Sequence, residues 1–389
     1  AVTNRPAGLV RPRIAATVNV TEEAIHSWVD MPSLYDEVNE TRELILLEQA
    51  PADRRVRVRP GDGVGSLLVV PLVARDELLG ALFATKPVTF GFEKDDIDAI
   101  GVFAAQAALA LDHARLFEEQ VEKERLSREL DIARAVQRRL LPQHVPNMPG
   151  ATIAASSVPA LEVGGDYYDF ARLDEHRLAF IVADVAGKGT SAAFYMAEMQ
   201  GIFQSVSRIS SSPTDFLVHA NNALSPSLER QTFISVIYGI LDTRTEEVTL
   251  ARAGHCPAAL INLHGDTRFL RSRGLGLGLD RTERFGAILA EERVALSPGD
   301  VLVLYTDGVV ETRNPSGEEY GYDRLLEILR KNRHEDVDDL HRAIVRDLTD
   351  FAEDENYGDD MTIMILKWQG VMSTREIARS PVRRAAIER

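Results

Sequence analysis

The stretch FIVADVAGKGTSAAF, residues 180–194, places an apolar strand, an acid and a glycine-rich turn directly before an alanine-rich helix. The apolar run up to Ala183 is typical of a buried strand, so it delivers the carboxylate of Asp184 to the edge of a sheet. A glycine beside such an acid lets the backbone approach a ligand closely. The stretch therefore predicts a strand-to-helix turn that carries a binding site.

This turn does not fit a nucleotide-binding loop. A P-loop needs Gly, four residues, Gly-Lys and then Ser or Thr. Val182 stands where the first glycine is required, and Gly189 follows Lys188. An ATP-driven activity built on this loop is therefore excluded.

Other strand-like runs in the same region also end in acids or lie beside glycine. These acids are Asp166 and Asp169 in GGDYYD, Asp307 in LVLYTDG, and Asp359 and Asp360 in YGDDMTIMI. Several such ends together form an oxygen-rich pocket of the kind that Mg²⁺ and Mn²⁺ prefer, with water in the remaining positions. Each acid alone is typical of an ordinary turn, so the recurrence within one domain is what favours a metal site.

Length and composition predict two or three globular domains. Hydrophobic residues make up 45% of the 389 residues, which excludes a disordered chain. The formal net charge of −16 disfavours nucleic-acid binding through a general basic field. Cys256 is the single cysteine, so an internal disulfide and a cysteine-cluster zinc site are excluded and a reducing compartment is expected.

Targeting signals are not found in the sequence. No apolar run approaches the about 18 residues of a membrane span, and no signal-peptide pattern begins the chain. We therefore expect a cytoplasmic protein with no membrane span. The first residue is Ala1 rather than Met, as expected of a fragment or a processed chain.

The first part of the chain predicts a mixed α/β domain. RPRIAATVNV (11–20) carries strand-forming residues, and the runs SLLVVPLV (66–73) and LLGALFATK (78–86) predict a hairpin around a short turn. A helix is expected from about Lys94.

That helix is expected to be unusually long. From residue 94 to residue 141 there is no proline, and Gly101 is the only glycine, whereas globular helices usually stop earlier. A run of positions with steps of 4, 3, 4 and 3 follows a heptad seam: Leu126, Leu130, Ala133, Gln137 and Leu140. Two interpretations stay open, an amphipathic helix packed on its own domain and a coiled-coil connector between two protomers.

The region 151–368 predicts an α+β fold, sheet on sheet with helices outside. Helices are expected over 189–209, 213–228, 322–331 and 336–352, and strands over 176–185 and 361–368. Between them, FISVIYGIL, EVTLARAG, PAALINL and TRFLRS predict an antiparallel meander. The tail 370–389, rich in arginine, is expected to be a linker stub.

Nucleophilic catalysis by a side chain is poorly supported. Cys256 follows His255 in AGHCPA, but no phosphate-cradling loop ending in Arg comes after it, so a small buried residue is the better interpretation. No Gly-x-Ser-x-Gly elbow is found.

Six motifs stand in the order of a known family: GGDYYDF, ADVAGKGTSAA, ARAGHCPAAL, GLGLGL, LVLYTDGVVE and GDDMTIMIL. The region 120–368 resembles the SpoIIE/RsbU-like branch of PPM-type protein phosphatases. Residues 15–115 resemble the second half of a GAF sensor domain. The expected division is a partial GAF-like domain over 1–110, a helical coiled-coil linker over 111–145, a PPM-type β-sandwich over 146–369 and the tail.

The resemblance implies a metal-dependent serine/threonine phosphatase with two Mn²⁺ or Mg²⁺ ions between its sheets. By motif match Asp184 bridges both ions, and the carbonyl of Val185 is a ligand. Asp307 and Asp359 hold one ion, and Asp166 serves the other directly or through water. These acids are the implied catalytic residues, with a metal-activated water as the attacking group.

Two further acids, Asp169 and Asp360, are implied to orient ligands and waters, or to act as ligands. Lys188 as a phosphate contact and His255 as a general acid are the weaker alternatives to a solvated lysine and a structural histidine.

The family also implies partners and control. Its usual substrate is a phosphorylated anti-anti-sigma (STAS) protein, and the sensor domain controls the metal site through the helical linker, which forms a homodimer. The alternatives are a pseudophosphatase that acts as a signalling binding module, and a metal-dependent nuclease or cyclase, which the acidic charge disfavours.

Overall fold

The computed structural model describes residues 3–4, 13–14, 16–19, 32–56, 58, 62–353 and 358–370. The chain divides into two compact units, Ala1–Ser127 and Arg128–Arg389, which are treated separately below. The predicted tail lies outside the described residues except for Gly370, and so does most of the strand-forming stretch 11–20.

Unit 1 contains a three-stranded antiparallel sheet of β3 (Ile45–Leu47), β4 (Ser66–Ala74) and β5 (Glu77–Lys86), in that order. Its other elements are β1 (Thr3–Asn4), which pairs with β2 (Arg13–Ile14), helix α2 (Pro32–Thr41) and the short helix η1 (Ala50–Ala52). The predicted hairpin is confirmed. Its two turn residues, Arg75 and Asp76, both have positive φ values of 48° and 67°, as a tight hairpin turn requires.

The predicted long helix is confirmed as α3 (Lys94–Leu140). Ala104 and Ala108 are buried against Leu68 and Leu72 of β4, because small side chains let a helix pack closely on a sheet. By length and composition alone, α3 contains an 18-residue window of mean hydropathy 1.2 that could cross a membrane. Of this window, 17% is buried inside the structure.

The C-terminal end of α3 departs from the predicted heptad seam. Leu140, together with Leu141, packs against the core of unit 2, and Gln137 hydrogen-bonds the backbone of Gly164. This end of the seam therefore packs within its own chain, because a heptad pattern marks an apolar stripe without saying what covers it. The seam residue Leu126 and the neighbouring Phe117 are exposed.

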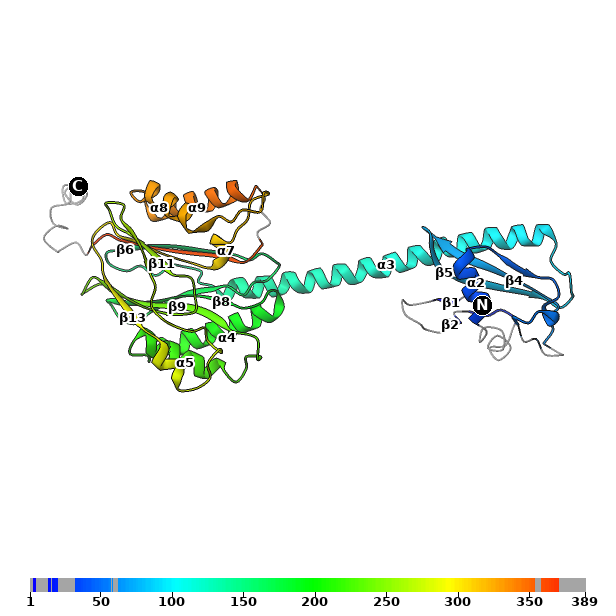
Figure 1. Cartoon of the computed structure of the whole chain (residues 1–389), viewed down its shortest axis with the longest axis horizontal. Helices are drawn as coiled ribbons and strands as arrows, with labels where there is room; N and C mark the ends of the chain where they lie inside the picture. Colours follow the sequence, from blue (N-terminus) through cyan, green and yellow to red (C-terminus); the bar gives the residue numbers. More distant parts are fainter. Residues whose placement is uncertain are drawn as a thin grey trace, which may run out of the picture. The chain divides into compact units, whose positions relative to one another are not determined.

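Unit 2 consists of two stacked five-stranded antiparallel sheets (Figure 1). The first has the order β13 (Glu291–Ala295), β10 (Glu247–Ala253), β9 (Ile234–Asp242), β8 (Arg177–Val185), β7 (Tyr167–Arg172). The second has the order β12 (Thr267–Leu270), β11 (Ala258–Ile261), β14 (Val301–Tyr305), β15 (Met361–Trp368), β6 (Ala151–Val158). The predicted α+β sandwich is confirmed.

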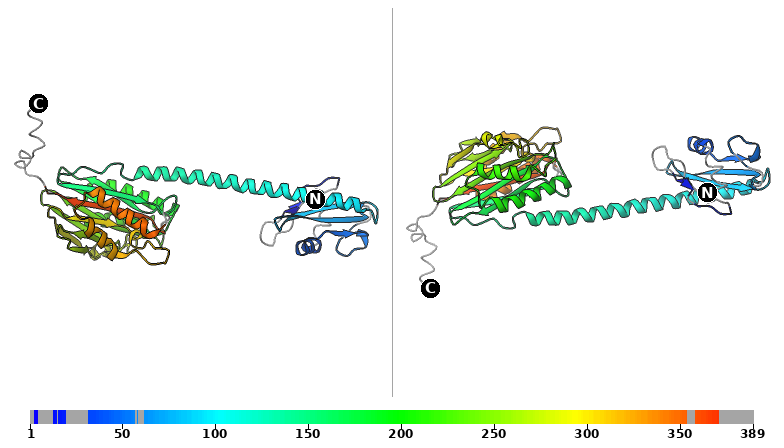
Figure 2. Two further views of the ribbon diagram at one scale, coloured as in Figure 1. Left: turned by 90° about the horizontal axis from the view of Figure 1, so that it is seen from above. Right: turned by 90° about the horizontal axis from the view of Figure 1, so that it is seen from below.

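Helices cover both outer faces of this sandwich. On the first sheet lie α4 (Thr190–Val206), α5 (Pro213–Leu224) and the short α6 (Arg284–Ile288); on the second lie α7 (Asp307–Val310), α8 (Gly321–Asn332) and α9 (Val337–Ala352). In Figure 2, α8 and α9 (orange) cross in front of the strands from above, and α4 and α5 (green) do so from below. Unit 2 therefore has four layers.

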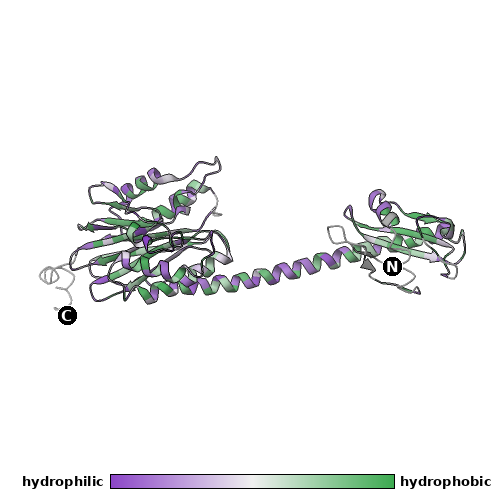
Figure 3. Ribbon diagram, turned by 60° about the horizontal axis from the view of Figure 1, so that its bottom comes forward, coloured by the Kyte–Doolittle hydropathy of each residue, from purple (hydrophilic) through white to green (hydrophobic). Residues whose placement is uncertain are grey.

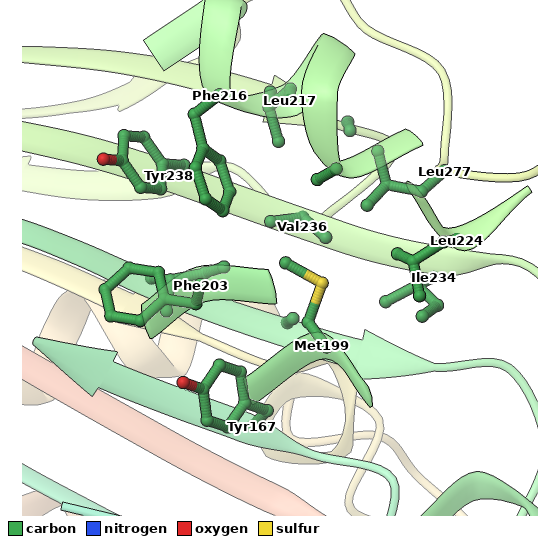
Figure 4. Close-up of a cluster of buried hydrophobic side chains, with 14 of the residues drawn as sticks. Tyr167, Met199, Phe203, Phe216, Leu217, Leu224, Ile234, Val236, Tyr238 and Leu277 are labelled. Atoms are coloured by element: carbon green, nitrogen blue, oxygen red, sulfur yellow. The ribbon is translucent and has the colours of Figure 1, made fainter. Parts of the chain in front are cut away.

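Three apolar clusters hold these layers together. Between the sheets lie Phe180, Leu302 and Trp368, all fully buried. Under α4 and α5, the Phe216 ring stacks on Tyr238 with ring centroids 4.0 Å apart (Figure 4), a favourable arrangement for two buried aromatic rings. The strands are accordingly coloured mostly hydrophobic in Figure 3, whereas the middle of α3 alternates between the two colours.

The predicted meander is wrong at one point. β9 and β10 pair in the first sheet, but β11 and β12 pair in the second. The chain crosses between sheets over residues 254–257, the sequence Gly-His-Cys-Pro. Alternating strand patterns do not reveal such a change of sheet, because each strand is buried in the same way in either one.

Candidate functional site

An open pocket of about 300 Å³ lies in unit 2 where five chain segments meet. The segments are the end of β8 with its following loop, the start of β9, the crossover after β10, the start of α7 and the loop before β15. The pocket is lined by Asp184, Val185, Ala186, Gly187, Lys188, Phe233, Ser235, Gly254, His255, Cys256, Asp307 and Asp359. Three predicted acids and Val185 are therefore brought together.

Both sheets deliver these acids through the ends of buried strands. Asp184 is the next-to-last residue of β8 in the first sheet, opposite Ser235 of β9. Asp307, the first residue of α7, is separated from the end of β14 by Thr306, and Asp359 is separated from the start of β15 by Asp360. Because β14 and β15 are paired neighbours, their two acids emerge side by side.

Burial and, after it, the charges of neighbouring acids raise the pKa values of the acids in this pocket. Burial raises the pKa of Asp184 to about 7, with the negative charges of Asp307 and Asp359 adding to the effect and Lys188 opposing it. Burial and then the charge of Asp359 also raise the pKa of Asp307. Like charges gathered in a partly desolvated pocket are the arrangement that a bound cation would stabilise.

Asp166 lies behind the lining residues and is only 4% exposed. Its Oδ2 accepts a 2.7 Å hydrogen bond from Thr306 Oγ1, whereas its Oδ1 is buried and finds no hydrogen-bond partner among the described residues. Burial, and next the charge of Asp184, raise the pKa of Asp166 well above its usual value. A carboxylate oxygen without a hydrogen-bond partner near Asp184 is suited to ligate a cation or to accept a hydrogen bond from a cation's bound water.

Asp360 does not line the pocket and instead holds the loop that leads into Asp166. Its Oδ1 accepts from the Ala160 N–H at 2.8 Å, and its Oδ2 accepts from the Gly165 N–H at 2.5 Å. A Cβ on Gly164 would lie 2.5 Å from the same Oδ2. The first glycine of EVGGDYYDF therefore permits close packing against a carboxylate.

Asp169 lies on the other face of β7, toward α4. Its Oδ2 accepts from the Tyr167 hydroxyl at 2.7 Å and from Gln204 Nε2 at 2.6 Å, and its Oδ1 accepts from the Phe170 N–H at 2.7 Å. Of these three donors only Gln204 belongs to α4, so its hydrogen bond ties α4 to the first sheet. Asp169 does not line the pocket, and its predicted part in orienting ligands stays a prediction.

The two other polar candidates of the crossover are uncharged. Burial lowers the pKa of His255 to about 3, and its Nδ1 shares a 2.6 Å hydrogen bond with Ser235 Oγ. Burial raises the pKa of Cys256 to about 12, so it is a thiol at neutral pH. A neutral histidine and a protonated thiol suit structural roles better than acid or nucleophilic catalysis.

Lys188 is the cation of the pocket. Its Nζ lies 2.9 Å from Asp359 Oδ2 and donates to the Gly358 carbonyl at 2.6 Å. The side chains of both ion-pair partners are more than 40% exposed, so this contact is solvated and weak. It leaves Asp184 and Asp307 without a direct ion-pair partner in the described part of the chain.

The sequence did not predict that Thr306 and Gln137 contact the residues of the site. Thr306 stands directly before Asp307 at the end of a strand-like run, so its place was a readable signal. Gln137 has no such signal, because its partner, the backbone of Gly164, is distant in sequence.

The donor set fits a hard cation held partly through water. Within the ranges that the structure describes, no three His, Cys, Asp or Glu side chains converge closely enough to hold one ion by themselves. Mg²⁺ typically keeps several waters and binds through one or two carboxylates. The pocket supplies carboxylates of that number and kind, together with the unsatisfied oxygen of Asp166.

Comparison with known proteins agrees with this geometry. Residues 174–369 match the family model "Stage II sporulation protein E (SpoIIE)", and residues 10–111 match the GAF domain model. The chain is 29% identical over 249 residues to "Phosphoserine phosphatase RsbU" of Bacillus subtilis, covering 63% of this chain and 71% of that protein.

A second relative and a solved structure extend the comparison. "Protein IcfG" of Synechocystis is 27% identical over 267 residues, but the match covers only 41% of its length and 60% of this chain. The solved SiaA-PP2C domain of Pseudomonas aeruginosa shares the fold, with a TM-score of 0.55 and 22% identity over 64% of this chain and 98% of that one. With half of its length inside the family model and a matching two-sheet fold, this chain belongs to the SpoIIE family of PPM-type protein phosphatases.

Proposed function

We propose that this chain hydrolyses phosphoserine or phosphothreonine in a protein substrate, at the pocket lined by Asp184, Asp307 and Asp359, with Mn²⁺ or Mg²⁺ as cofactor. The observation that carries the proposal is that these three acids, which come from both sheets, line one open pocket. Their mutual repulsion gives the pocket the electrostatics of a cation site. Two ions are proposed.

Asp184 and the Val185 carbonyl are proposed to be ligands at the centre of the site. Asp184 lies near enough to Asp307 and Asp359 for the charges of both to raise its pKa. A Cβ on Gly165 would lie 3.0 Å from the Val185 oxygen, so this carbonyl faces the loop that leads into Asp166. This placement suits Asp184 as the bridging ligand and Val185 as its neighbour.

The remaining ligands are assigned by position. Asp307 and Asp359, which emerge from paired strands, hold one ion, and Asp166 serves the other directly or through water. Asp360 and Asp169 lie outside the pocket lining and are proposed to orient these ligands and their waters. When bound, such ions lower the pKa of water and neutralise charge on phosphoryl oxygens.

The protein residues themselves provide the remaining part of catalysis. Thr306 holds Asp166 Oδ2 in place, and the ends of β8, β14 and β15 fix the spacing of the other acids. Lys188 can leave its solvated contact with Asp359 and donate to a phosphate oxygen at the open side of the pocket.

The proposed division of the chain is a GAF-like sensor over 1–110, a linker over 111–145, the phosphatase domain over 146–369 and a tail stub over 370–389. The substrate is proposed to be a phosphorylated STAS-type anti-anti-sigma protein, supported by the similarity to a protein named phosphoserine phosphatase. A cytoplasmic location is proposed on the basis of the single cysteine.

Control by the sensor domain is proposed to pass through α3. Gln137 near the end of this helix contacts the Gly164 backbone, which leads into Asp166. Side chains farther up α3, Phe117, Val121 and Leu126, are 49–68% exposed and are proposed to form a homodimer seam. Sedimentation would show a monomer for Leu126→Glu, whereas a dimer of unchanged stability in this variant would contradict the seam.

The test of the function is hydrolysis of p-nitrophenyl phosphate in Mn²⁺ and in EDTA. We expect activity only with metal, and Asp307→Asn should reduce kcat by about 100-fold or more. The control is Asp350→Asn, an exposed acid on α9, which should retain full activity. Hydrolysis in EDTA would contradict the metal requirement, and no hydrolysis in any metal would favour a pseudophosphatase that binds a partner without turnover.

A further inference from the structure

The crossover side of the pocket carries an arginine that the proposed function does not use. We propose that Arg271 recognises acidic side chains that flank the phosphorylated residue of the protein substrate. This inference rests on the proposed phosphatase function and names how its site would select a substrate.

Strand register places Arg271 at the rim of the pocket. In the antiparallel pair of β11 and β12, Ala258 lies opposite Leu270. Arg271 directly follows β12, and Cys256, which lines the pocket, stands two residues before β11. The segment that begins with Arg271 therefore lies beside the crossover that forms one wall of the pocket.

A second arginine, Arg252, supports this placement through two hydrogen bonds. Arg252 Nε donates to the Ser272 carbonyl at 3.1 Å, and Arg252 Nη1 donates to the His255 carbonyl. Arg252 thus ties the segment after β12 to the crossover and is half-buried. It is a positioning residue rather than a free cation for a ligand.

Arg271, in contrast, is exposed, and its guanidinium has no hydrogen bond or ion pair within the stretches that the structure describes. Its carbon Cζ lies 5.1 Å from the centroid of the Phe269 ring, a cation–π distance that holds the group while leaving its N–H donors to solvent. An arginine held this way is prepared to bind a carboxylate at a small entropic cost.

An aromatic platform connects Arg271 to the pocket wall. The Phe269 ring contacts the Tyr322 ring edge to face, with centroids 5.5 Å apart, and Tyr322 lies close enough to Cys256 for each side chain to shift the pKa of the other. Tyr322 is 40% exposed. A peptide whose phosphate enters the pocket would therefore cross Tyr322 before it reaches Arg271.

The charge pattern favours flanking carboxylates over the reacting phosphate as the ligand. The positive charge that lowers the pKa values of Asp184 and Asp307 is that of Lys188, not that of Arg271. The charge of Arg271 instead lowers the pKa values of Tyr322 and Tyr305, which are not among the acids of the pocket. The negative charge of Glu311 raises the pKa of Tyr322, so Glu311 lies on the same part of the rim. Its charge would repel a substrate's carboxylates and steer them toward the arginine.

The sequence concentrates positive charge at this rim. RSRG, residues 271–274, contains two arginines and no acid, in a chain of net charge −16. A locally basic rim on an acidic protein selects for acidic segments and raises their rate of encounter.

The experiment compares two phosphoserine peptides that differ only in Glu or Gln at the positions flanking phosphoserine, with p-nitrophenyl phosphate as a substrate that has no flanking residues. We expect the wild-type chain to prefer the Glu peptide by about five-fold in kcat/KM, the size of one solvated charge pair. Arg271→Ala should abolish this preference through KM, and Arg271→Glu should reverse it in favour of the Gln peptide. Hydrolysis of p-nitrophenyl phosphate should not change.

The matched control is Arg268→Ala, an exposed arginine of β12, which should keep the preference. A preference that survives Arg271→Ala, or an equal loss with p-nitrophenyl phosphate, would overturn the assignment. If the wild-type chain hydrolyses none of these substrates, the proposed function fails. Fluorescence anisotropy of the labelled peptides then tests the role of Arg271 separately from hydrolysis. Equal binding of the Glu and Gln peptides would refute that role.

Discussion

Close packing between Gly164 and the Asp360 carboxylate governs the position of Asp166 at the scale of single residues. Asp360 accepts hydrogen bonds from Ala160 and Gly165, so the carboxylate must lie directly against the backbone of the loop. A side chain at residue 164 would occupy the same space. Asp360 therefore shapes the loop before Asp166, and its predicted part in orienting ligands stays a prediction.

Gly164→Ala is expected to destabilise the fold by about 1–3 kcal/mol, because its Cβ would lie 2.5 Å from Asp360 Oδ2 and force the loop to shift. Affinity for Mn²⁺ should fall with it. Chemical denaturation and metal titration measure the two effects. The control is Gly201→Ala in α4, where a Cβ meets nothing within 4 Å and should stabilise the helix by up to about 1 kcal/mol. Equal effects of the two variants would contradict this packing argument.

The raised pKa of Asp184 predicts an unusual pH dependence for the protein in EDTA. Burial and the neighbouring acids raise this pKa from 3.8 to about 7, so between those values the folded chain binds a proton that the unfolded chain has lost. The free energy of unfolding should therefore fall as pH rises through this window, by up to about 1.4 kcal/mol per pH unit.

Asp184→Asn should flatten this fall, because the side chain no longer titrates. Denaturant unfolding at pH 5 and pH 8 measures the difference, and added Mn²⁺ should restore stability to the wild-type chain at pH 8. The same pH dependence in both proteins would show that Asp184 is not the group responsible.

At the scale of elements, the sequence predicts most of the fold but not which surfaces meet. Periodicity and breakers predict α3, α4, α5 and the β4–β5 hairpin, since each depends on local residues. The change of sheet at Gly254–Pro257 escapes prediction because it is a long-range choice between equally apolar surfaces. Likewise, Gln137 reads as a seam residue, whereas its partner is the Gly164 backbone of its own chain.

Gln137→Ala is expected to weaken the connection between α3 and the loop before Asp166. The variant loses hydrogen bonds of 2.6 and 3.1 Å to Gly164 and leaves a buried N–H and C=O unsatisfied, at a cost of about 1–3 kcal/mol. Mn²⁺ affinity should fall as well. Gln120→Ala, which removes an exposed contact with Glu124 on the same helix, is the control. Unchanged metal affinity in Gln137→Ala would separate α3 from the site.

At the scale of the whole molecule, two sheets are needed because neither alone collects the acids. Asp184 comes from the first sheet, and Asp307 and Asp359 come from the second. The recurrence of acids at strand ends could be read from the sequence, and the family resemblance supplied their order. The spacing of the acids, the orphaned Asp166 oxygen and the arginine rim depend on how the sheets stack, which no local pattern encodes.

The central claim is that the pocket acids hold the metal ions on which hydrolysis depends. Calorimetric titration of Mn²⁺ into the full chain and into Asp184→Asn at pH 7.5, with hydrolysis followed in parallel, tests it most directly. We predict two ions per wild-type chain, with activity that rises with occupancy, and loss of both binding and activity in Asp184→Asn although the variant stays folded in EDTA. Unchanged Mn²⁺ stoichiometry and affinity in Asp184→Asn would contradict the account.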